Sequence, residues 1–353
     1  MSTVVTQSST ATATRTSSAD VFHSRGEGGS EETPHDEYQN LLASLPEANV
    51  RALWTFMSDA SPPVPNPRAI PFVWSYQESL RPRIMEAGRL VPAELAERRV
   101  LLLNNPGIVA AGMFGITDTL FSGIQLVNPG ETAPAHRHTA FALRYIIEGN
   151  KGFTDVEGDK LYMCEGDVIL TPNWKWHDHG NEGDRPMVWL DGLDLPIWQR
   201  VPVNFTEEYE HPRYPAEDTD TSEYLFRWTE VTKDLDSQPT SYATHNYTKY
   251  DGSELSAVVG ADAYRIDENT WSPLRLETTC FVFHVYKGTG YTLVGKGIKQ
   301  VKLEWKSKDV FCIPAYTQFK SFATSNSYLF SFCDRPLLQK LEAHRIFEVK
   351  DEE

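Results

Sequence analysis

From Val100 onward the apolar residues fall into short continuous or alternating runs, which Gly, Pro and Asn separate. The first block of runs reads FSGIQLV, ALRYIIEG, GFTDVEG, KLYMCEGDVIL and MVWLDGL. Short, evenly spaced apolar runs with turn residues between them are typical of an antiparallel β-sandwich or barrel. The pattern therefore predicts a mainly β chain.

The same texture returns in the last third of the chain. Sliding one block over the other aligns YIIEG at 145–149 with HVYKG at 284–288, and GDVILTP at 166–172 with KDVFCIP at 308–314. Self-similarity of this kind indicates a repeated structural unit. We therefore predict an internal duplication of a small β-barrel.

The region before the barrels has a different texture. Its first 35 residues are rich in Ser, Thr, Gly and Glu, with little to bury. From Asp36 to Met57 apolar residues recur at three- and four-residue steps around Pro46, which predicts two short helices, and PAELAERR at 92–99 predicts a third. In chain order we expect a disordered tail (1–35), an N-terminal helical segment (36–99), a first barrel (100–200), a connection (201–250), a second barrel (251–340) and a C-terminal tail (341–353).

Charge and composition limit the classes of binding partner that the protein can have. The chain has 33 Lys and Arg against 49 Asp and Glu, a net charge of −16, so nucleic acids and anionic membrane surfaces should repel it. No apolar stretch reaches the roughly 18 residues that a membrane span needs. Four scattered cysteines without a CxxC pair indicate reduced thiols. We expect a cytoplasmic protein, because one arginine, Arg15, makes a poor mitochondrial targeting helix.

Two histidine doublets carry the candidate chemistry. The chain has ten histidines, so an HxH pattern is expected by chance about 0.3 times. Two occur, His136-Arg-His138 and His177-Asp-His179. Alternate side chains of a strand share a face, so His136 and His138 should point together into the barrel, and a neighbouring strand can bring His177 beside them. Three imidazoles suit iron(II), copper, zinc or nickel; the alternative is a hydrogen-bonded polar core.

These residues resemble the two cupin motifs. Gly130 is followed after five residues by HRH, and Gly166 after five residues by Pro172, then by His177 and Asn181. Three departures are the missing Glu ligand after the HxH, Arg144 in that region, and Trp174 in place of a glycine. The same departures, with APAHRHTAFALRYIIEG, LTPNWKWHDHGNEG and WLDGLDLP, resemble the gentisate 1,2-dioxygenase family and its salicylate and 1-hydroxy-2-naphthoate relatives.

The resemblance implies a duplicated cupin, a double-stranded β-helix or jelly-roll barrel, with short N-terminal helices. It also implies one Fe(II) per chain, bound by His136, His138 and His177 in the first barrel. The implied activity opens the ring of gentisate (2,5-dihydroxybenzoate) with O2, between the carboxyl-bearing and the adjacent hydroxyl-bearing carbons, to give maleylpyruvate. Salicylate and 1-hydroxy-2-naphthoate remain alternative substrates. A homotetramer or another homo-oligomer is implied as well.

The second barrel looks degenerate under the internal alignment. Arg275, Glu277 and Phe319 stand where His136, His138 and His177 stand in the first barrel. These three residues make no imidazole site, so we expect no catalytic metal there. His284, which lies alone on a strand of this barrel, is expected to be structural.

The missing Glu ligand has a simple consequence. Three imidazoles leave three of six octahedral positions, enough for a chelating carboxylate and phenolic oxygen together with O2. The substrate carboxylate still needs a partner. Arg144 lies six residues beyond His138, an even offset that places it on the inward face, and its guanidinium matches a carboxylate.

Other site residues follow from the resemblance. Arg99 is a second carboxylate or ring contact, with Arg98 equally suitable by chemistry. His179 is a hydrogen-bond donor or proton shuttle, although its position also allows a fourth ligand. Asp191 and Gln125 match positions that line the pocket, and Phe121 would pack on the ring.

Two hypotheses about other classes of function remain open. A non-catalytic bicupin that binds a small molecule would hold no iron. A zinc cupin such as an isomerase would usually keep the Glu ligand that this chain lacks.

Overall fold

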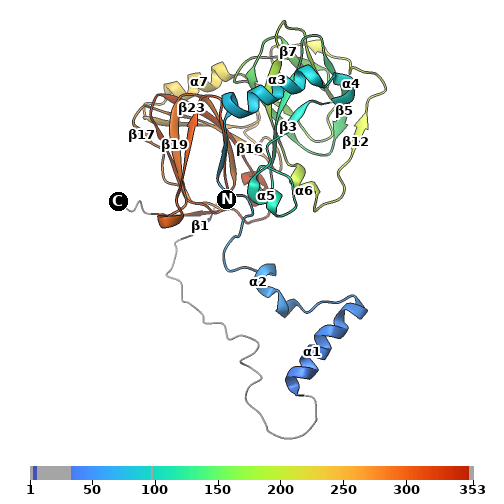
Figure 1. Ribbon diagram of the computed structural model, residues 1–353. Coiled ribbons are helices and arrows are strands. Elements are labelled where there is room, and N and C mark those ends of the chain that lie inside the picture. The colour runs from blue at the N-terminus through green and yellow to red at the C-terminus, as the bar shows by residue number, and fades with distance from the viewer. Residues whose placement is uncertain (1–2, 6–32, 97, 350–353) are drawn as a thin grey trace. The chain divides into compact units, whose positions relative to one another are not determined.

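The computed structural model describes residues 3–5, 33–96 and 98–349, and Figure 1 shows their ribbon. Residues 1–5 and 67–353 form one unit and residues 6–66 another. Most of the predicted tail, 1–35, lies outside the described residues. Its described part includes strand β1 (Thr3–Val5), which pairs in parallel with β24 (Arg345–Phe347).

The N-terminal unit is helical in its described part. Helix α1 begins after Thr33, whose hydroxyl accepts from the Asp36 backbone N–H while the Asp36 carboxylate accepts from Thr33, a capping box. Pro46 lies in the first turn of a 3₁₀ segment, where its missing N–H leaves no hydrogen bond unmade. The elements are α1 (Pro34–Ser44), η1 (Leu45–Ala48), η2 (Leu53–Thr55) and α2 (Met57–Ala60).

The first barrel consists of two facing six-stranded sheets, drawn largely in green in Figure 1. Their strand orders are β12-β5-β10-β7-β8-β13 and β14-β9-β6-β11-β4-β3. The central strands are buried on both faces, which explains their continuous apolar runs. The bounds are β3 (Val100–Leu102), β4 (Phe121–Val127), β5 (Thr132–His138), β6 (Ala142–Glu148), β7 (Gly152–Val156), β8 (Asp159–Met163), β9 (Val168–Thr171), β10 (His177–Asn181), β11 (Met187–Leu193), β12 (Thr206–Glu208), β13 (Glu217–Asp218) and β14 (Leu225–Phe226).

The second barrel, in orange and brown, repeats this plan with a smaller second sheet. Its strand orders are β15-β16-β23-β18-β21-β2 and β17-β22-β19-β20. The bounds are β2 (Phe72–Trp74), β15 (Tyr242–Tyr247), β16 (Gly260–Ile266), β17 (Thr270–Trp271), β18 (Phe281–Lys287), β19 (Thr289–Val294), β20 (Val301–Lys306), β21 (Val310–Ile313), β22 (Phe319–Ala323) and β23 (Ser327–Cys333).

Equivalent turns in the two barrels confirm the predicted duplication. Asp167 accepts from the backbone N–H of Cys164 through one carboxylate oxygen and from Trp228 through the other. Asp309 does the same for Lys306 and Tyr76. Each aspartate follows a residue with left-handed φ, Gly166 at 91° and Lys308 at 75°. A mainly β, duplicated barrel with short helices is therefore the observed fold.

One apolar core joins the barrels. Tyr145 of β6 stacks on Phe330 of β23 with ring centroids 4.4 Å apart, and His284 of β18 lies 4.8 Å from the same tyrosine ring. All three side chains are fully buried. Strand β6, which carries Arg144 on its other face, therefore rests on the second barrel.

The helices around the barrels depart from the sequence pattern. A helical stretch over 76–90, η3 and α3, was not predicted, and the helix predicted over 92–99 spans only Ala93–Ala96. Strand β2, within the segment expected to be helical, was not predicted either. The helices are η3 (Tyr76–Leu80), α3 (Arg81–Leu90), α4 (Ala93–Ala96), α5 (Pro106–Ala110), α6 (Leu195–Trp198), α7 (Trp228–Ser237), η4 (Gly297–Lys299) and α8 (Arg335–Lys340).

Two sequence features can be checked directly. In the part of the chain that the structure describes, no helix is both long and apolar enough to cross a membrane. All four cysteines are free thiols; Cys164 is exposed and the other three are buried.

Candidate metal centre

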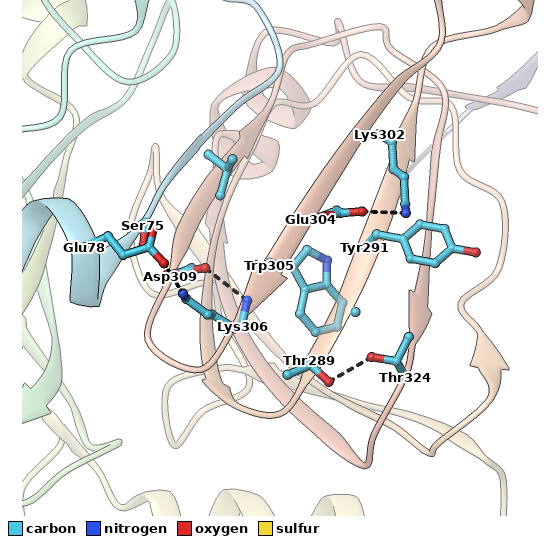
Figure 2. A pocket seen from close by; sticks show the side chains of 12 residues that line it. Ser75, Glu78, Thr289, Tyr291, Lys302, Glu304, Trp305, Lys306, Asp309 and Thr324 are labelled. Carbon is cyan, nitrogen blue, oxygen red and sulfur yellow. Dashed lines mark hydrogen bonds and ion pairs between the residues drawn. The ribbon is translucent and has the colours of Figure 1, made fainter.

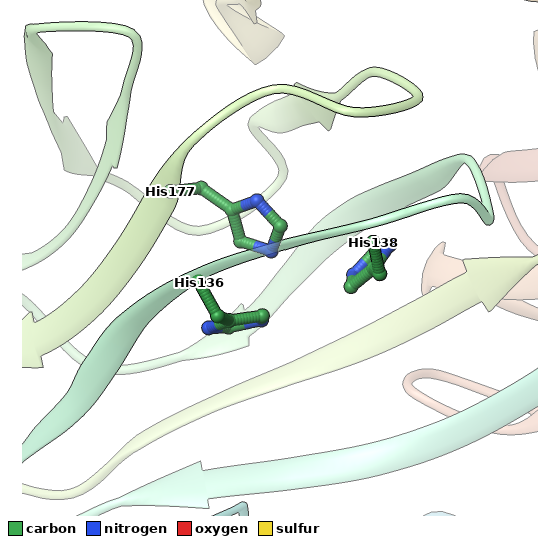
Figure 3. A group of neighbouring side chains, drawn as sticks. All are labelled: His136, His138 and His177. Atoms are coloured by element: carbon green, nitrogen blue, oxygen red, sulfur yellow. The ribbon is translucent and has the colours of Figure 1, made fainter. Parts of the chain in front are cut away.

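Three histidines converge inside the first barrel (Figure 3). His136 and His138 share one face of β5, and His177 of β10 lies directly opposite His136 in the antiparallel ladder. The ring centroids of His177 lie 4.2 Å from His136 and 4.8 Å from His138. One ligand nitrogen from each ring lies within 4.8 Å of the other two. The barrel thus brings together the three ligands predicted from the doublets.

Backbone carbonyls fix how each ring presents its nitrogens. The Nδ1 atoms of His136, His138 and His177 each lie 2.8 Å from a carbonyl oxygen, of Pro134, Ala140 and Lys175 respectively. A carbonyl can only accept, so each Nδ1 carries the proton and each Nε2 keeps its lone pair. The Nε2 of His177 is buried and has no hydrogen-bond partner among the described residues. This donor set fits a divalent metal ion.

Burial keeps the three imidazoles neutral. Loss of solvent lowers the pKa of His136 to about 2 and that of His138 to about 4, with the Arg98 charge as the next cause. The pKa of His177 is also lowered, by burial first and then by the other two imidazoles. Protons therefore compete little with a metal for these nitrogens at neutral pH.

His179 lies beside the triad but is held differently. Its Nδ1 is 3.0 Å from the hydroxyl of Thr154, which can donate or accept, so this contact does not fix the tautomer. Its Nε2 is buried without a partner among the described residues, and its ring centroid lies 5.5 Å from that of His177. The residue is therefore available for a hydrogen bond or a proton transfer next to the ligands.

Arg144 provides a buried cation at the site. Its Nε lies 3.5 Å from Oδ1 of Asp191, the residue opposite it on β11, and its Nη1 donates to the Thr171 hydroxyl at 3.0 Å. Asp191 also accepts from the indole N–H of Trp189 at 3.0 Å. Burial lowers the pKa of Arg144 to about 10 and raises that of Asp191 to about 6. The guanidinium charge in turn lowers the pKa of all four histidines.

Arg99, predicted as a second substrate contact, has its guanidinium engaged with other protein groups in this structure. Its guanidinium binds both carboxylate oxygens of Glu131, at 2.8 and 2.9 Å, and the backbone carbonyls of Val91 and Leu126. These five hydrogen bonds use every donor of the guanidinium. Arg98, the alternative by chemistry, is exposed, and its charge is the second cause that lowers the pKa of His136 and His138. Both arginines stay predictions as substrate contacts.

Gln125 and Phe121 both lie on β4. Gln125 is buried opposite Trp189, and its amide nitrogen has no partner among the described residues. Phe121 begins the strand and is half-buried opposite Leu193. Gln125 therefore offers an unused donor, whereas the contact of Phe121 with a substrate ring stays a prediction.

The second barrel has replaced the ligands with a salt bridge. Arg275 pairs with Phe319 across the ladder, at the place where His136 pairs with His177. Its guanidinium binds Glu277 at 2.6 Å and lies over the rings of Phe281 and Phe319. Among the described residues, the histidine triad is the one group of His, Cys, Asp or Glu side chains that could hold a metal ion. A second barrel without a catalytic metal stays a prediction.

A separate hollow of about 570 Å³ lies against the second barrel (Figure 2). Its two lysines are already paired, Lys302 with Glu304 and Lys306 with Glu78. It contains no histidine.

Sequence reasoning missed three residues that shape the site. Trp189 holds Asp191 and lies 5.9 Å from the His179 ring, Thr154 holds His179, and Thr171 holds Arg144. The alternation Trp189-Leu-Asp191 on one strand signals a shared inward face. Single threonines on buried strands carry no such signal.

Comparisons with known proteins agree with this geometry. The cupin domain family matches residues 123–193, a range that contains the triad. Gentisate 1,2 dioxygenase 1 of Aquipseudomonas alcaligenes is 31% identical over 335 residues, covering 86% of this chain and 94% of that relative. The 5-aminosalicylate 1,2-dioxygenase of a Comamonas species is 31% identical over 354 residues, with 88% and 91% covered. A solved salicylate 1,2-dioxygenase of Pseudoaminobacter salicylatoxidans, with gentisate adducts, has a TM-score of 0.81 at 29% identity, covering 92% of this chain and 96% of that one.

Proposed function

Because this chain belongs to the gentisate 1,2-dioxygenase family of ring-cleaving cupin oxidoreductases, we propose that it binds iron(II) and cleaves gentisate. The observation that carries the proposal is the pairing of three convergent imidazole lone pairs with a buried guanidinium, Arg144. Three neutral ligands leave a divalent ion its full charge and open positions for a chelating acid. The family also argues against a non-catalytic bicupin.

Iron(II) held by His136, His138 and His177 would supply Lewis-acid and electron-transfer chemistry toward the ring and O2. The chain's own residues do the rest. Arg144 orients the substrate carboxylate, since it is a buried cation whose Nη1 is already held by the Thr171 hydroxyl. Asp191 holds the guanidinium through an ion pair with its Nε. The local cations overcome the net charge of −16 that would otherwise repel an anionic acid.

His179 and Gln125 complete the polar lining. The free Nε2 of His179 can exchange a hydrogen bond or a proton with a ring hydroxyl, because Thr154 holds the opposite nitrogen. Gln125 offers an amide N–H to the substrate. The product of cleavage between the carboxyl-bearing and adjacent hydroxyl-bearing carbons is maleylpyruvate, which takes up both atoms of O2.

Oxygen uptake with defined acids tests the proposal. Protein reconstituted anaerobically with iron(II) is mixed with gentisate, salicylate or 1-hydroxy-2-naphthoate, and O2 consumption and ring absorbance are followed together. We expect the fastest uptake with gentisate, and none from zinc-loaded protein. Faster turnover of either monohydroxy acid would reassign the substrate, and no uptake with any of the three acids would reject the function.

A further inference from the structure

A segment after the first barrel runs along the outside of the metal strands. Strand β12 pairs with β5 in a register that sets Thr206 opposite His138 and Glu208 opposite His136. Beyond it, the N–H of Tyr209 donates to the carbonyl of Ala135 at 2.9 Å. Residues 205–214, which we call the strap, therefore cover the edge of β5 that faces away from β10.

The two ligand strands are poorly joined where the ligands lie. The β5–β10 ladder shifts register between His177 and His179, so regular pairing is interrupted within the histidine doublet of β10. A bulge of this kind re-aims side chains but leaves ladder hydrogen bonds unmade. Something else must hold β10 against β5 at this point.

The end of the strap spans the interruption. The carbonyl of Pro212 accepts from the N–H of Ala135 on β5 at 3.0 Å. The next two residues bind Asp178 on β10: Arg213 Nε donates to Oδ1 and the Tyr214 N–H to Oδ2, both at 3.0 Å. Asp178 stands between the two histidines of β10. Three consecutive strap residues thus connect the strands that carry all three metal ligands.

Arg213 also neutralises a carboxylate pair behind the site. Asp155 of β7 lies opposite Asp178 in the ladder, and both side chains are fully buried. Arg213 binds Asp155 through Nη2 and Asp178 through Nε. Without Arg213, both buried carboxylates would lose the guanidinium that joins β7 to β10.

We propose that Arg213 is a positioning residue for the metal centre, which keeps His177 in register with His136 and so sets how long the metal is retained. The inference rests on the proposed metal centre. When a residue that orients a metal ligand without touching the metal is removed, the metal affinity typically falls about 10- to 100-fold. Here the group acts through strand position, since Arg213 touches no ligand side chain directly.

Metal release is the direct test. Wild type, Arg213→Ala and Arg213→Lys are loaded with iron(II) without oxygen, and transfer of iron to a chromogenic ferrous chelator is timed. The thermal midpoint of each metal-free protein is measured in parallel. We expect release about 10- to 100-fold faster from Arg213→Ala, and intermediate from Arg213→Lys, because an ammonium cannot span both carboxylates as a fork does.

Arg227→Ala is the matched control. Arg227 also binds a buried aspartate of the first barrel, Asp167, at 2.7 Å, but Asp167 precedes β9, in the sheet without metal ligands. We expect this variant to lower the thermal midpoint and to leave iron release unchanged. Equal release from the two alanine variants would overturn the proposal.

Two further outcomes are decisive. Should Arg213→Ala fail to fold, Arg213→Gln and Arg213→Lys replace it, and wild-type release from both would overturn the proposal. If the wild-type protein retains no iron, the proposed metal centre is rejected, and the inference that rests on it is rejected as well. Retention by wild type with unchanged release from the Arg213 variants would reject the inference alone.

Discussion

Arg144 lies opposite Asp191 across the β6–β11 ladder, with its Nε 3.5 Å from Asp191 Oδ1. Both side chains are buried, so each charge depends on the other for compensation. The guanidinium charge also lowers the pKa of the metal-ligand histidines His136 and His177. A substrate carboxylate thus meets a cation that is already anchored.

Arg144→Leu should raise the KM for gentisate about 10- to 100-fold, because a charge-assisted pair with the carboxylate is lost. Bound iron, measured by metal analysis, should change little, since no ligand is touched. Arg144→Leu/Asp191→Asn controls for the unpaired buried carboxylate that the single change leaves. An unchanged KM in both variants would show that the carboxylate binds elsewhere.

His177→Ala should abolish iron binding, since its Nε2 completes the triad. His245→Ala is the control: His245 pairs with Asp234 in the second barrel's edge strand, at 2.8 Å. Iron per chain after anaerobic reconstitution distinguishes them, with about one iron expected for the control and little for His177→Ala. Full iron in His177→Ala would reject the ligand assignment.

The barrel and its ligands could be predicted because they depend on local periodicity. His136 and His138 share a face on any regular strand, and turns such as GDVILTP and KDVFCIP repeat in both halves. Arg99 could not be placed this way, because Val100 begins β3 and side-chain direction at the strand start depends on Glu131, 32 residues away. Arg98 and Arg99 are chemically identical in the sequence, and only the tertiary partner separates them.

Contacts between segments that are distant in the sequence could not be predicted from the sequence either. Strand β2 forms because Phe72–Trp74 completes the sheet of the second barrel beside β21, about 240 residues later. The strap was expected only as a connection over 201–250, since its pairing with β5 is set by the barrel and not by its own polar residues. Thr154 and Thr171 act through one hydroxyl each, and nothing in their local sequence distinguishes them from core threonines.

The binding of Arg99 to Glu131 predicts different effects for changes at the two neighbouring arginines. Arg99→Ala breaks a bidentate pair between buried Arg99 and half-buried Glu131 and should cost about 1–3 kcal/mol of stability, with the KM for gentisate unchanged. Arg98→Ala should raise that KM several-fold at a smaller cost in stability, because Arg98 is exposed and is the neighbouring candidate for the second carboxylate contact. Denaturant unfolding and steady-state kinetics on both variants check this; a raised KM for Arg99→Ala alone would reverse the assignment.

His284 should make the protein sensitive to acid. Both of its ring nitrogens are buried without partners among the described residues, and burial lowers its pKa to about 3 from 6.5. In the unfolded chain His284 binds a proton below pH 6.5, whereas in the folded chain it binds one only below about pH 3. Its contribution to the free energy of unfolding is therefore present above pH 6.5 and is lost as the pH falls through this window.

His284→Phe removes the difference, since Phe is apolar like its neighbours Tyr145 and Phe330 and does not titrate. Between pH 6.5 and 4 the free energy of unfolding of wild type should therefore fall more steeply than that of the variant, by about 1.4 kcal/mol per pH unit. The comparison uses metal-free protein, so that protonation of the triad contributes equally to both profiles, and parallel profiles would mean that His284 is not kept neutral in the fold.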